Sequence, residues 1–431
     1  MTKTRFRSAA TPSHRPPSLP QAAMSVDALI HDLQPQEPVV CLRPHQLKAT
    51  AGQFGRGFAR AVKSAGMAGG DVLYAVKCNP EPAVLRALWR GGVRHFDCAS
   101  PGEIRLVRSM FADAHIHYMH PIKPEAAVRE AYFSHGVRDF SLDSVEEIEK
   151  IVRATEFADD LGLFIRIAMP KGSAKFDLSA KFGATVQAAA ELLRLGRPVA
   201  RRLGVCFHVG SQCLDPAAYG RALDMAGQAI RASGVAIDIV DVGGGFPVAY
   251  PGEVPPDLND YFAAIAAGVQ RLGLPASTRI WCEPGRALVA AGASVVVRVE
   301  AVRAHAEGRV LHINDGVFGS LADAGAIGMR FPTRALRASE AALVETAFYG
   351  PTCDSADFMA GPFLVPADVK AGDYIELGQL GAYGTCLRTA FNGFDRVLIA
   401  DVIDRPLIRT PGHPDVLGSG AVIAPAAPKA A

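Results

Sequence analysis

The feature that most constrains the fold is a regular alternation of short apolar runs with segments of helical spacing between residues 52 and 291. The runs occupy residues 71–77, 95–100, 116–123, 139–144, 163–169, 204–211, 238–245 and 279–285. Between them, apolar residues recur three and four positions apart, as at Val84, Leu85 and Leu88 in "PEPAVLRALWRGG". Eight such strand–helix units predict an α/β fold with a (β/α)8 barrel of the TIM type over 52–291. The alternative is an open, doubly wound sheet, which the even number of units disfavours.

The sequence changes character at residue 292. Segments such as "ASVVVRVEAVRA", "RVLHIND" and "DYIELGQLGAYG" are β-type runs broken by Gly and Asp, without regular helical spacing between them. They predict a C-terminal antiparallel β domain over 292–415. The run "PVVCL", within residues 36–51, predicts an N-terminal strand that joins this domain.

The two ends of the chain differ in composition from the rest. Residues 1–35 are rich in Pro, Ser and Arg, and the first acidic residue is Asp27. Such a segment buries too little apolar area to order itself, so we predict a disordered N-terminal extension. An Arg-containing start without acidic residues also leaves an organelle-targeting segment open. The Gly- and Ala-rich tail over 416–431 is predicted to be disordered as well.

Composition excludes several classes of function. The 45 basic and 43 acidic residues give a net charge of +2, which provides no electrostatic basis for binding nucleic acid or a membrane surface. No run approaches the roughly 18 apolar residues of a membrane span. The eight cysteines include no CxxC pair, so the sequence predicts no metal site, and a reducing cytoplasm is the expected location.

Reactive side chains follow the predicted strands at the ends where barrel enzymes place their active sites. These residues are Lys77, Asp97, Arg166, His208, Ser211, Gly243, Gly244, Gly245, Glu283 and Arg286. Each alone has an ordinary explanation, such as a solvated strand end or a tight turn. Together they offer an amine for a Schiff base, a glycine-rich cradle for a phosphate and a carboxylate for a ring nitrogen. That combination predicts pyridoxal 5′-phosphate (PLP) as the cofactor.

Seven motifs carry a resemblance to a known family. They are "YAVKCNP", "FDCAS", "FHVGSQ", "VGGGFP", "EPGR", "GPTCDSAD" and "LGAYGTCLRTAFNGF". The chain resembles the fold-type III PLP-dependent decarboxylases that act on ornithine, lysine or diaminopimelate, and the match runs from about residue 36 to 410. "GPTCD" and "FNGF" are more similar to the ornithine branch, because diaminopimelate enzymes usually have "CES" where this chain has "CDS".

The resemblance implies a role for each matching residue. Cofactor binding would fall to Lys77, Asp97, Arg166, His208, Ser211, Gly243, Gly244, Gly245, Glu283, Gly285, Arg286 and Tyr383. Within that set, Lys77 would hold the aldehyde carbon, Glu283 would face the pyridinium nitrogen and His208 would stack on the ring. A carboxylate keeps the ring nitrogen protonated and electron-withdrawing, which favours decarboxylation, whereas the related racemases use an arginine there.

The motif "GPTCD" implies a homodimer with shared active sites. Cys353 would return a proton after decarboxylation and Asp354 would bind the distal amine of the substrate, both in the site of the partner subunit. The catalytic residues implied in this way are Lys77, His208, Glu283 and Cys353.

The segment "NDGVFGSLADAGAIGMRFP" departs from the family pattern. Phe318 replaces the usual tyrosine, and Ala326 and Ile327 occupy the positions where the family has an acid for the distal ammonium. We therefore assign substrate binding to Asp354, Asp323 and Phe318, because a desolvated ammonium needs a paired charge.

The expected reaction is decarboxylation of L-ornithine to putrescine in polyamine biosynthesis, with L-lysine to cadaverine as a further activity. A diaminopimelate decarboxylase, in which Arg330 would bind the distal carboxylate, is one alternative. A decarboxylase for a non-standard amino acid is another, and a non-catalytic regulatory homologue is a remote third.

Overall fold

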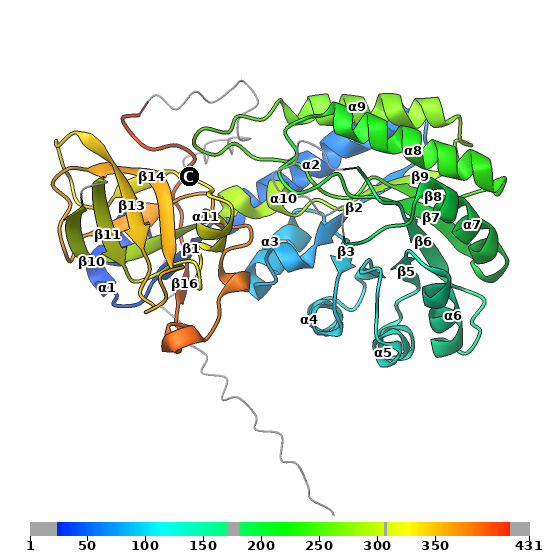
Figure 1. The fold of residues 1–431 in the computed structure, drawn as a ribbon, viewed down its shortest axis with the longest axis horizontal. Helices are drawn as coiled ribbons and strands as arrows, with labels where there is room; N and C mark the ends of the chain where they lie inside the picture. Colours follow the sequence, from blue (N-terminus) through cyan, green and yellow to red (C-terminus); the bar gives the residue numbers. More distant parts are fainter. Residues whose placement is uncertain (1–23, 171–180, 306–307, 414–431) are drawn as a thin grey trace, which may run out of the picture.

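The computed structural model describes residues 24–170, 181–305 and 308–413, which form a barrel and a separate sheet domain (Figure 1). Eight parallel strands close the barrel in chain order from β2 to β9, and β9 pairs with β2 through Ile280 and Gly70. The strands are β2 Gly70–Ala75, β3 His95–Cys98, β4 His115–Tyr118, β5 Asp139–Leu142, β6 Gly162–Arg166, β7 Arg202–Cys206, β8 Ile239–Asp241 and β9 Arg279–Cys282. This closure confirms the (β/α)8 barrel and excludes the open sheet.

Helices cover the outside of the barrel. They are α2 Pro44–Ser64, α3 Pro82–Arg90, α4 Pro101–Met110, α5 Glu125–His135, α6 Val145–Ala154, α7 Val186–Gly196, α8 Ala217–Ser233 and α9 Leu258–Leu272, whereas the short α10 Arg286–Val289 follows β9 on the side of the sheet domain (Figure 1). Local sequence sets where several begin: the hydroxyls of Ser100, Ser144 and Thr185 accept hydrogen bonds from backbone N–H groups in the first turn. Single 3-10 turns lie at η1 Val76–Cys78, η2 Arg197–Val199, η3 Ala290–Gly292, η4 Thr385–Leu387 and η5 Phe391–Gly393. None of the helices in the described ranges has both the length and the apolar character needed to cross a bilayer.

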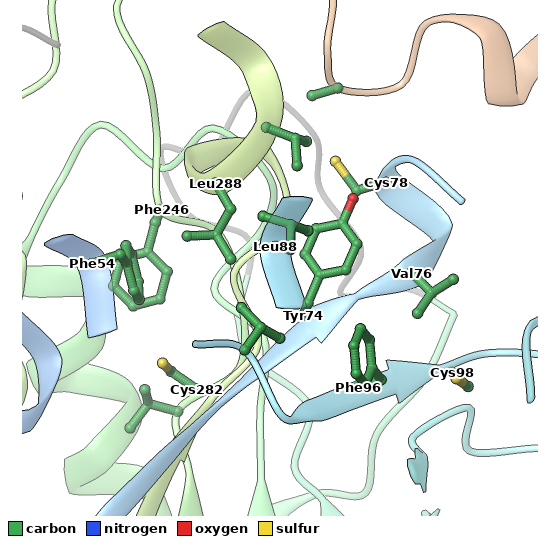
Figure 2. Packing of buried hydrophobic residues seen from close by; sticks show 14 of the residues in the cluster. Phe54, Tyr74, Val76, Cys78, Leu88, Phe96, Cys98, Phe246, Cys282 and Leu288 are labelled. Carbon is green, nitrogen blue, oxygen red and sulfur yellow. The ribbon is translucent and has the colours of Figure 1, made fainter. Parts of the chain in front are cut away.

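The apolar core lies between the barrel wall and its helices (Figure 2). Phe54 of α2 packs edge-on against Phe246 at 5.1 Å and against Phe262 of α9 at 5.2 Å between ring centroids. On the wall itself, Tyr74 of β2 pairs with Phe96 of β3, and both are fully buried. The Tyr74 hydroxyl donates to the carbonyl of Asn79 at 3.0 Å, so its polar end is satisfied inside the core. This packing fixes the end of β2 and the residues that follow it.

The second domain is one eight-stranded sheet. Its strands are β1 Val39–Leu42, β10 Ala293–His305, β11 Gly308–Ile313, β12 Thr333–Ala335, β13 Leu343–Tyr349, β14 Phe358–Pro366, β15 Tyr374–Leu377 and β16 Leu398–Asp401, with the short helix α11 Ala322–Ala326 beside them. The sheet is mixed rather than purely antiparallel as predicted, because β11–β13 and β1–β16 are parallel pairs. The prediction of a separate β domain is confirmed.

The segment before the barrel belongs to this sheet. β1 runs antiparallel to β10 and parallel to β16, and Leu42 pairs with Ala293. The disorder predicted for residues 1–35 is wrong for 24–35, where α1 Val26–Leu33 buries Val26, Leu29 and Ile30. That stripe follows the N-cap Ser25, and together they supply the burial that composition alone did not reveal. Residues 1–23 and 416–431 lie outside the described residues.

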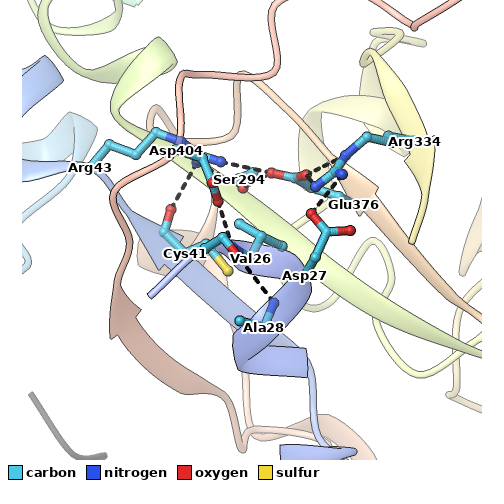
Figure 3. Close-up of polar contacts among 10 residues, drawn as sticks. Val26, Asp27, Ala28, Cys41, Arg43, Ser294, Arg334, Glu376 and Asp404 are labelled. Atoms are coloured by element: carbon cyan, nitrogen blue, oxygen red, sulfur yellow. Dashed lines mark hydrogen bonds and ion pairs between the residues drawn. The ribbon is translucent and has the colours of Figure 1, made fainter. Parts of the chain in front are cut away.

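A buried ion network joins α1 and the residue that follows β1 to the rest of the sheet (Figure 3). Arg43 donates to Glu376 at 2.8 Å and to the hydroxyl of Ser294 at 2.9 Å, and the side chains of Arg43 and Glu376 are each 1% exposed. Arg334 donates to the other oxygen of Glu376 at 2.7 Å and to Asp27 of α1 at 2.8 Å. One buried carboxylate therefore joins the start of the barrel, the sheet and the N-terminal helix.

Candidate functional site

Lys77 lies at the mouth formed by the C-terminal ends of the barrel strands. β2 ends at Ala75, so Lys77 is on the single turn η1 rather than on the strand, and its side chain is 42% exposed. Its Nζ donates to Asp97 Oδ2 of β3 at 3.0 Å, whereas Asp97 is 1% exposed. The other oxygen of Asp97 is buried without a hydrogen-bond partner among the described residues. An amine open on one side and held by a buried carboxylate on the other is suited to bind a ligand covalently.

The charge state of Lys77 follows from competing effects. Burial would lower the pKa of its ammonium, but the neighbouring Asp97, Tyr383 and Glu283 more than offset burial and raise the pKa above its usual value. Without a ligand, Lys77 is therefore protonated at neutral pH.

Two buried carboxyl groups lie side by side beneath the mouth. Glu283 follows β9 and Asp241 ends β8, and they are 7% and 0% exposed. Burial, together with Asp241 and then Asp97, raises the pKa of Glu283 well above its usual value. Burial likewise raises the pKa of Asp241 to about 6, although the N–H of Gly243 donates to Asp241 Oδ1 at 2.9 Å. The pair holds an extra proton at neutral pH, which can be kept at a ring nitrogen facing Glu283.

Asp241 is a site residue that sequence reasoning missed. Its signal was the second carboxylate of the run "DIVDVGGG", which interrupts the apolar stretch two residues before the glycines. A buried acid in a strand otherwise made of Ile and Val needs a partner, and Glu283 is that partner.

The three glycines allow strand ends to approach closely. Gly243 and Gly245 have φ of 67° and 105°, which side chains rarely adopt. A Cβ on Gly243 would lie 1.9 Å from the carbonyl oxygen of Phe207. A Cβ on Gly244 would lie 2.6 Å from the carbonyl oxygen of Glu283 and 3.0 Å from His208 Nε2. The bare backbone therefore forms a cradle between His208 and Glu283 that a phosphate or a flat ring can enter.

His208 presents a neutral imidazole to this cradle. Its Nδ1 accepts a hydrogen bond from the N–H of Gly210 at 2.9 Å, which leaves Nε2 to carry the proton. Burial, followed by the positive charges of Arg166 and Lys77, lowers its pKa well below the usual value. Ser211 is half-buried three residues further along the same loop.

Arg166 ends β6 at the same mouth. Its guanidinium lies 5.7 Å from the ring centroid of Phe182. Since its charge also lowers the pKa of His208, Arg166 contributes to the electrostatics of the cradle.

Arg286 is buried at the first position of α10. It donates to the hydroxyl of Tyr250 at 3.1 Å and to Asp323 Oδ2 at 3.0 Å, and its guanidinium lies 5.0 Å from the ring of Tyr383. The residue before it is Gly285, where any side chain would be too close to Cys78, because a Cβ would lie 2.9 Å from the Cβ of Cys78. The ion pair with Arg286 argues against the substrate role predicted for Asp323, since its carboxylate already compensates a buried guanidinium.

The remaining predicted residues lie on the sheet domain. Cys353 and Asp354 are exposed on the loop between β13 and β14, and neither makes a hydrogen bond to the barrel within the described ranges. The N–H of Cys353 donates to Asn392 Oδ1 at 3.1 Å, and Phe318 packs on Phe391 at 4.9 Å between centroids. The structure therefore brings the barrel residues together around Lys77 and leaves Cys353 and Asp354 on a separate exposed surface.

Large apolar side chains surround that surface. Leu387, Phe391 and Phe394 are 43%, 40% and 45% exposed, and Asn392 between the two phenylalanines contacts the Cys353 loop. Exposed apolar patches of this kind mark surfaces that associate with another protein.

The barrel residues fit PLP on their own chemistry. Lys77 supplies the amine, the Glu283–Asp241 pair a buried acid and the three glycines a backbone cradle. Arg286 and Tyr383 close the side of the mouth that faces the sheet domain, where the N–H of Tyr383 donates to the carbonyl of Cys78 at 2.9 Å.

Comparison with known proteins gives a consistent result. Residues 52–290 match the family described as pyridoxal-dependent decarboxylase, pyridoxal binding domain, and residues 262–381 match the C-terminal sheet domain of the same family. A lysine/ornithine decarboxylase of Selenomonas ruminantium is 33% identical over 328 residues, which are 75% of this chain and 81% of that protein. The ornithine decarboxylase of Mus musculus is 30% identical over 373 residues, covering 78% and 76% of the two chains.

A solved structure shares the fold as well. The arginine decarboxylase of Paramecium bursaria Chlorella virus, bound to agmatine, superimposes with a TM-score of 0.76 at 25% identity, over 88% of this chain and 99% of the viral one. The three relatives are thus named for different basic amino acids.

Proposed function

Because this chain belongs to the pyridoxal-dependent decarboxylases and is a PLP-dependent carboxy-lyase, we propose that it converts L-ornithine to putrescine and, less efficiently, L-lysine to cadaverine. The observation that carries the choice of a diamino acid is the exposed carboxylate of Asp354 beside Cys353. Asp354 Oδ1 accepts only the N–H of Ala356 among the described residues, at 2.9 Å, so the carboxylate is available to a ligand. An ammonium group of the substrate is the matching partner.

The residues at the mouth divide the work of binding and proton handling. Lys77 is the covalent attachment point, and Glu283, backed by Asp241, keeps a proton at the ring nitrogen. His208 offers a neutral flat face, and Arg286 with the glycine cradle binds the phosphate. When bound, PLP supplies the electron-withdrawing ring that disperses the negative charge left on Cα as CO2 leaves. We assign Asp97 the role of orienting Lys77.

The exposed loop supplies the remaining groups from a second subunit. Cys353 returns a proton to Cα, and Asp354 pairs with the distal ammonium. Phe318, which lacks a hydroxyl and packs on Phe391, forms an apolar wall along the methylene groups of the substrate. A homodimer fits this assignment, because association would cover the exposed Leu387 and Phe394.

The direct test is CO2 release from L-ornithine, L-lysine, L-arginine and meso-diaminopimelate by the PLP-loaded protein. The proposal predicts the highest kcat/KM for L-ornithine and a large loss in Asp354→Asn. Asp368→Asn removes a carboxylate from the same domain at a pair with Arg337 and serves as the control. Preference for L-arginine, or no turnover of any basic amino acid, would contradict the proposal.

Arg330 allows the diaminopimelate alternative to be tested in the same assay. Its side chain is exposed near Gly252, where a Cβ would lie 3.6 Å from its Nη1. A guanidinium at that position can pair with a distal carboxylate, which ornithine lacks. If meso-diaminopimelate is the best substrate and Arg330→Ala loses it selectively, the alternative assignment is correct.

The shared site is tested by mixing two variants, one inactive and one strongly impaired. Lys77→Ala lacks the attachment point, and Cys353→Ala lacks the proton donor. Mixed dimers contain one site with both residues intact, so the mixture should regain activity that neither variant has alone. If the mixture stays inactive although the subunits exchange, Cys353 does not act across the interface.

A further inference from the structure

A second cavity lies at the opposite end of the barrel from Lys77. It has a volume of about 480 Å³ and is bounded by the N-terminal ends of the strands. Asp71 lies at the start of β2, His95 at the start of β3 and His115 at the start of β4. Arg202 and Arg279 begin β7 and β9 in the same way. Nothing in the assignment of the PLP site uses these residues.

Three histidines form the inner wall of this cavity. The rings of His95 and His115 stack at 4.4 Å, and His95 Nδ1 lies 3.0 Å from His117 Nε2, so one proton is shared between them. His117 Nδ1 lies 2.9 Å from Asp139 Oδ2, and His95 Nε2 lies 3.4 Å from Asp71 Oδ1. Bulky aliphatic side chains usually fill this layer of a barrel, so the polar chain needs a different explanation.

Positive charge exceeds negative charge around the cavity. Its lining includes four guanidinium groups, from Arg108, Arg138, Arg202 and Arg279, but only two carboxylates, from Asp71 and Asp139. Arg279 and Arg202 pair with those two carboxylates, and Arg138 pairs with Asp160 outside the lining.

Arg108 differs from the other three arginines. Among the described residues it donates only to backbone carbonyls, those of His135, Ala112 and Ala114. Its charge therefore has no carboxylate partner there, and the cavity keeps a net positive charge.

We propose that this cavity is a second ligand site, which binds a small multivalent oxyanion such as a phosphate or a polycarboxylate. Arginine forks bind the oxygens of such groups in pairs, and the volume lies in the range of small-molecule sites. The charged and titratable groups that face His95 are Asp71, His115, His117 and Arg279.

Trp281 provides a reporter for this site. The chain has two tryptophans, and Trp281 lines the cavity while Trp89 stacks on Phe111 at 4.4 Å on the outside of the barrel. Trp89→Phe keeps that stacking and leaves Trp281 as the only source of indole fluorescence. The PLP-saturated protein is titrated with inorganic phosphate, pyrophosphate and citrate at constant ionic strength, with chloride as the monovalent reference. A saturable fluorescence change with an oxyanion, and none with chloride, is the expected result.

Two variants distinguish anion binding at this cavity from a nonspecific effect of ions on the protein's charges. Arg202→Gln, in the Trp89→Phe background, should weaken binding about tenfold, the typical effect of losing one charged hydrogen bond. Arg129 lies on α5 and forms an exposed ion pair with Glu156. Arg129→Gln removes the same charge there and should leave anion binding unchanged. If Arg202→Gln does not fold, Arg202→Lys keeps the charge but loses the planar fork and should still bind more weakly.

The three anions also distinguish the ligand class. Tighter binding of pyrophosphate than of citrate identifies a phosphate site, and the reverse order identifies a polycarboxylate site. The proposal is overturned if none of the three gives a saturable change. Equal dissociation constants in Arg202→Gln and Arg129→Gln would overturn it as well.

Discussion

Replacing Asp97 with asparagine is expected to lower the pKa of the Lys77 ammonium and with it the pH at which the protein attaches PLP. Burial lowers this pKa, and the charge of Asp97, followed by Tyr383 and Glu283, raises it by a larger amount. Asparagine has nearly the shape of aspartate but lacks the charge. In the variant, less negative charge offsets burial, and the pKa of Lys77 falls.

The magnitude follows from the geometry. Two unit charges 3.0 Å apart attract each other by about 5 kcal/mol at an effective dielectric constant of ~20. Lys77 is 42% exposed, so solvent screens a large part of this attraction. A fall of ~1–3 pKa units is therefore expected. At any pH well below the lowered pKa of the variant, the neutral amine becomes about 10 to 1000 times more abundant than in the unmodified protein.

The assay is the rate at which apoprotein attaches PLP, followed by stopped-flow absorbance from pH 6 to pH 10. The neutral amine is the nucleophile, so the pH profile of the second-order rate constant reports the pKa of Lys77. Borohydride reduction and peptide mass spectrometry then verify that Lys77 is the modified residue. Asp113→Asn, an exposed aspartate after α4, removes the same charge far from the mouth. A profile in Asp97→Asn that coincides with that of Asp113→Asn, or moves to higher pH, would refute the reasoning.

Three further outcomes follow from contacts described above. Arg43→Met removes the buried partner of Glu376 and should destabilise the protein by about 3 kcal/mol in thermal unfolding, whereas Arg396→Met, at an exposed pair, should have little effect. Burial, then His117, lowers the pKa of His95 to about 3, so the unfolded chain binds one more proton there between about pH 3 and 6.5. Stability should therefore fall by up to ~1.4 kcal/mol per pH unit below pH 6.5, and His95→Gln should flatten that slope in acid titrations followed by circular dichroism. Cys353→Ala should slow CO2 release by about 100-fold while PLP attachment is unchanged, and equal rates would contradict its role as proton donor.

The barrel could be predicted from the sequence because its signals are local and repeated. Each strand is a short apolar run, and each polar residue at a strand end lies at a mouth that the topology fixes in advance. Lys77, Asp97 and Glu283 therefore come together as the alternation implies. No knowledge of side-chain contacts was needed to place them.

The errors concern contacts between segments that are distant in the sequence. The substrate role of Asp323 stays a prediction, but its ion pair with Arg286 of the barrel has no local signal in the sequence. Asp241 was overlooked because its importance depends on Glu283, which follows the neighbouring strand β9. Helix α1 was hidden because its stabilising surface is the sheet domain, which no local composition can show.

The pairing of Leu42 with Ala293 makes the barrel an insertion between two adjacent strands of the sheet. During synthesis, the strand at 39–42 leaves the ribosome early, but its parallel neighbour at 398–401 is among the last ordered segments to emerge. The barrel can close on its own contacts while one edge of β1 is still uncovered. Exposed strand edges pair readily with other chains, so a protein truncated before residue 398 should aggregate although its barrel is complete. Among the described residues β16 is the last strand, so the free edge of β1 is covered only after nearly the whole chain has been made.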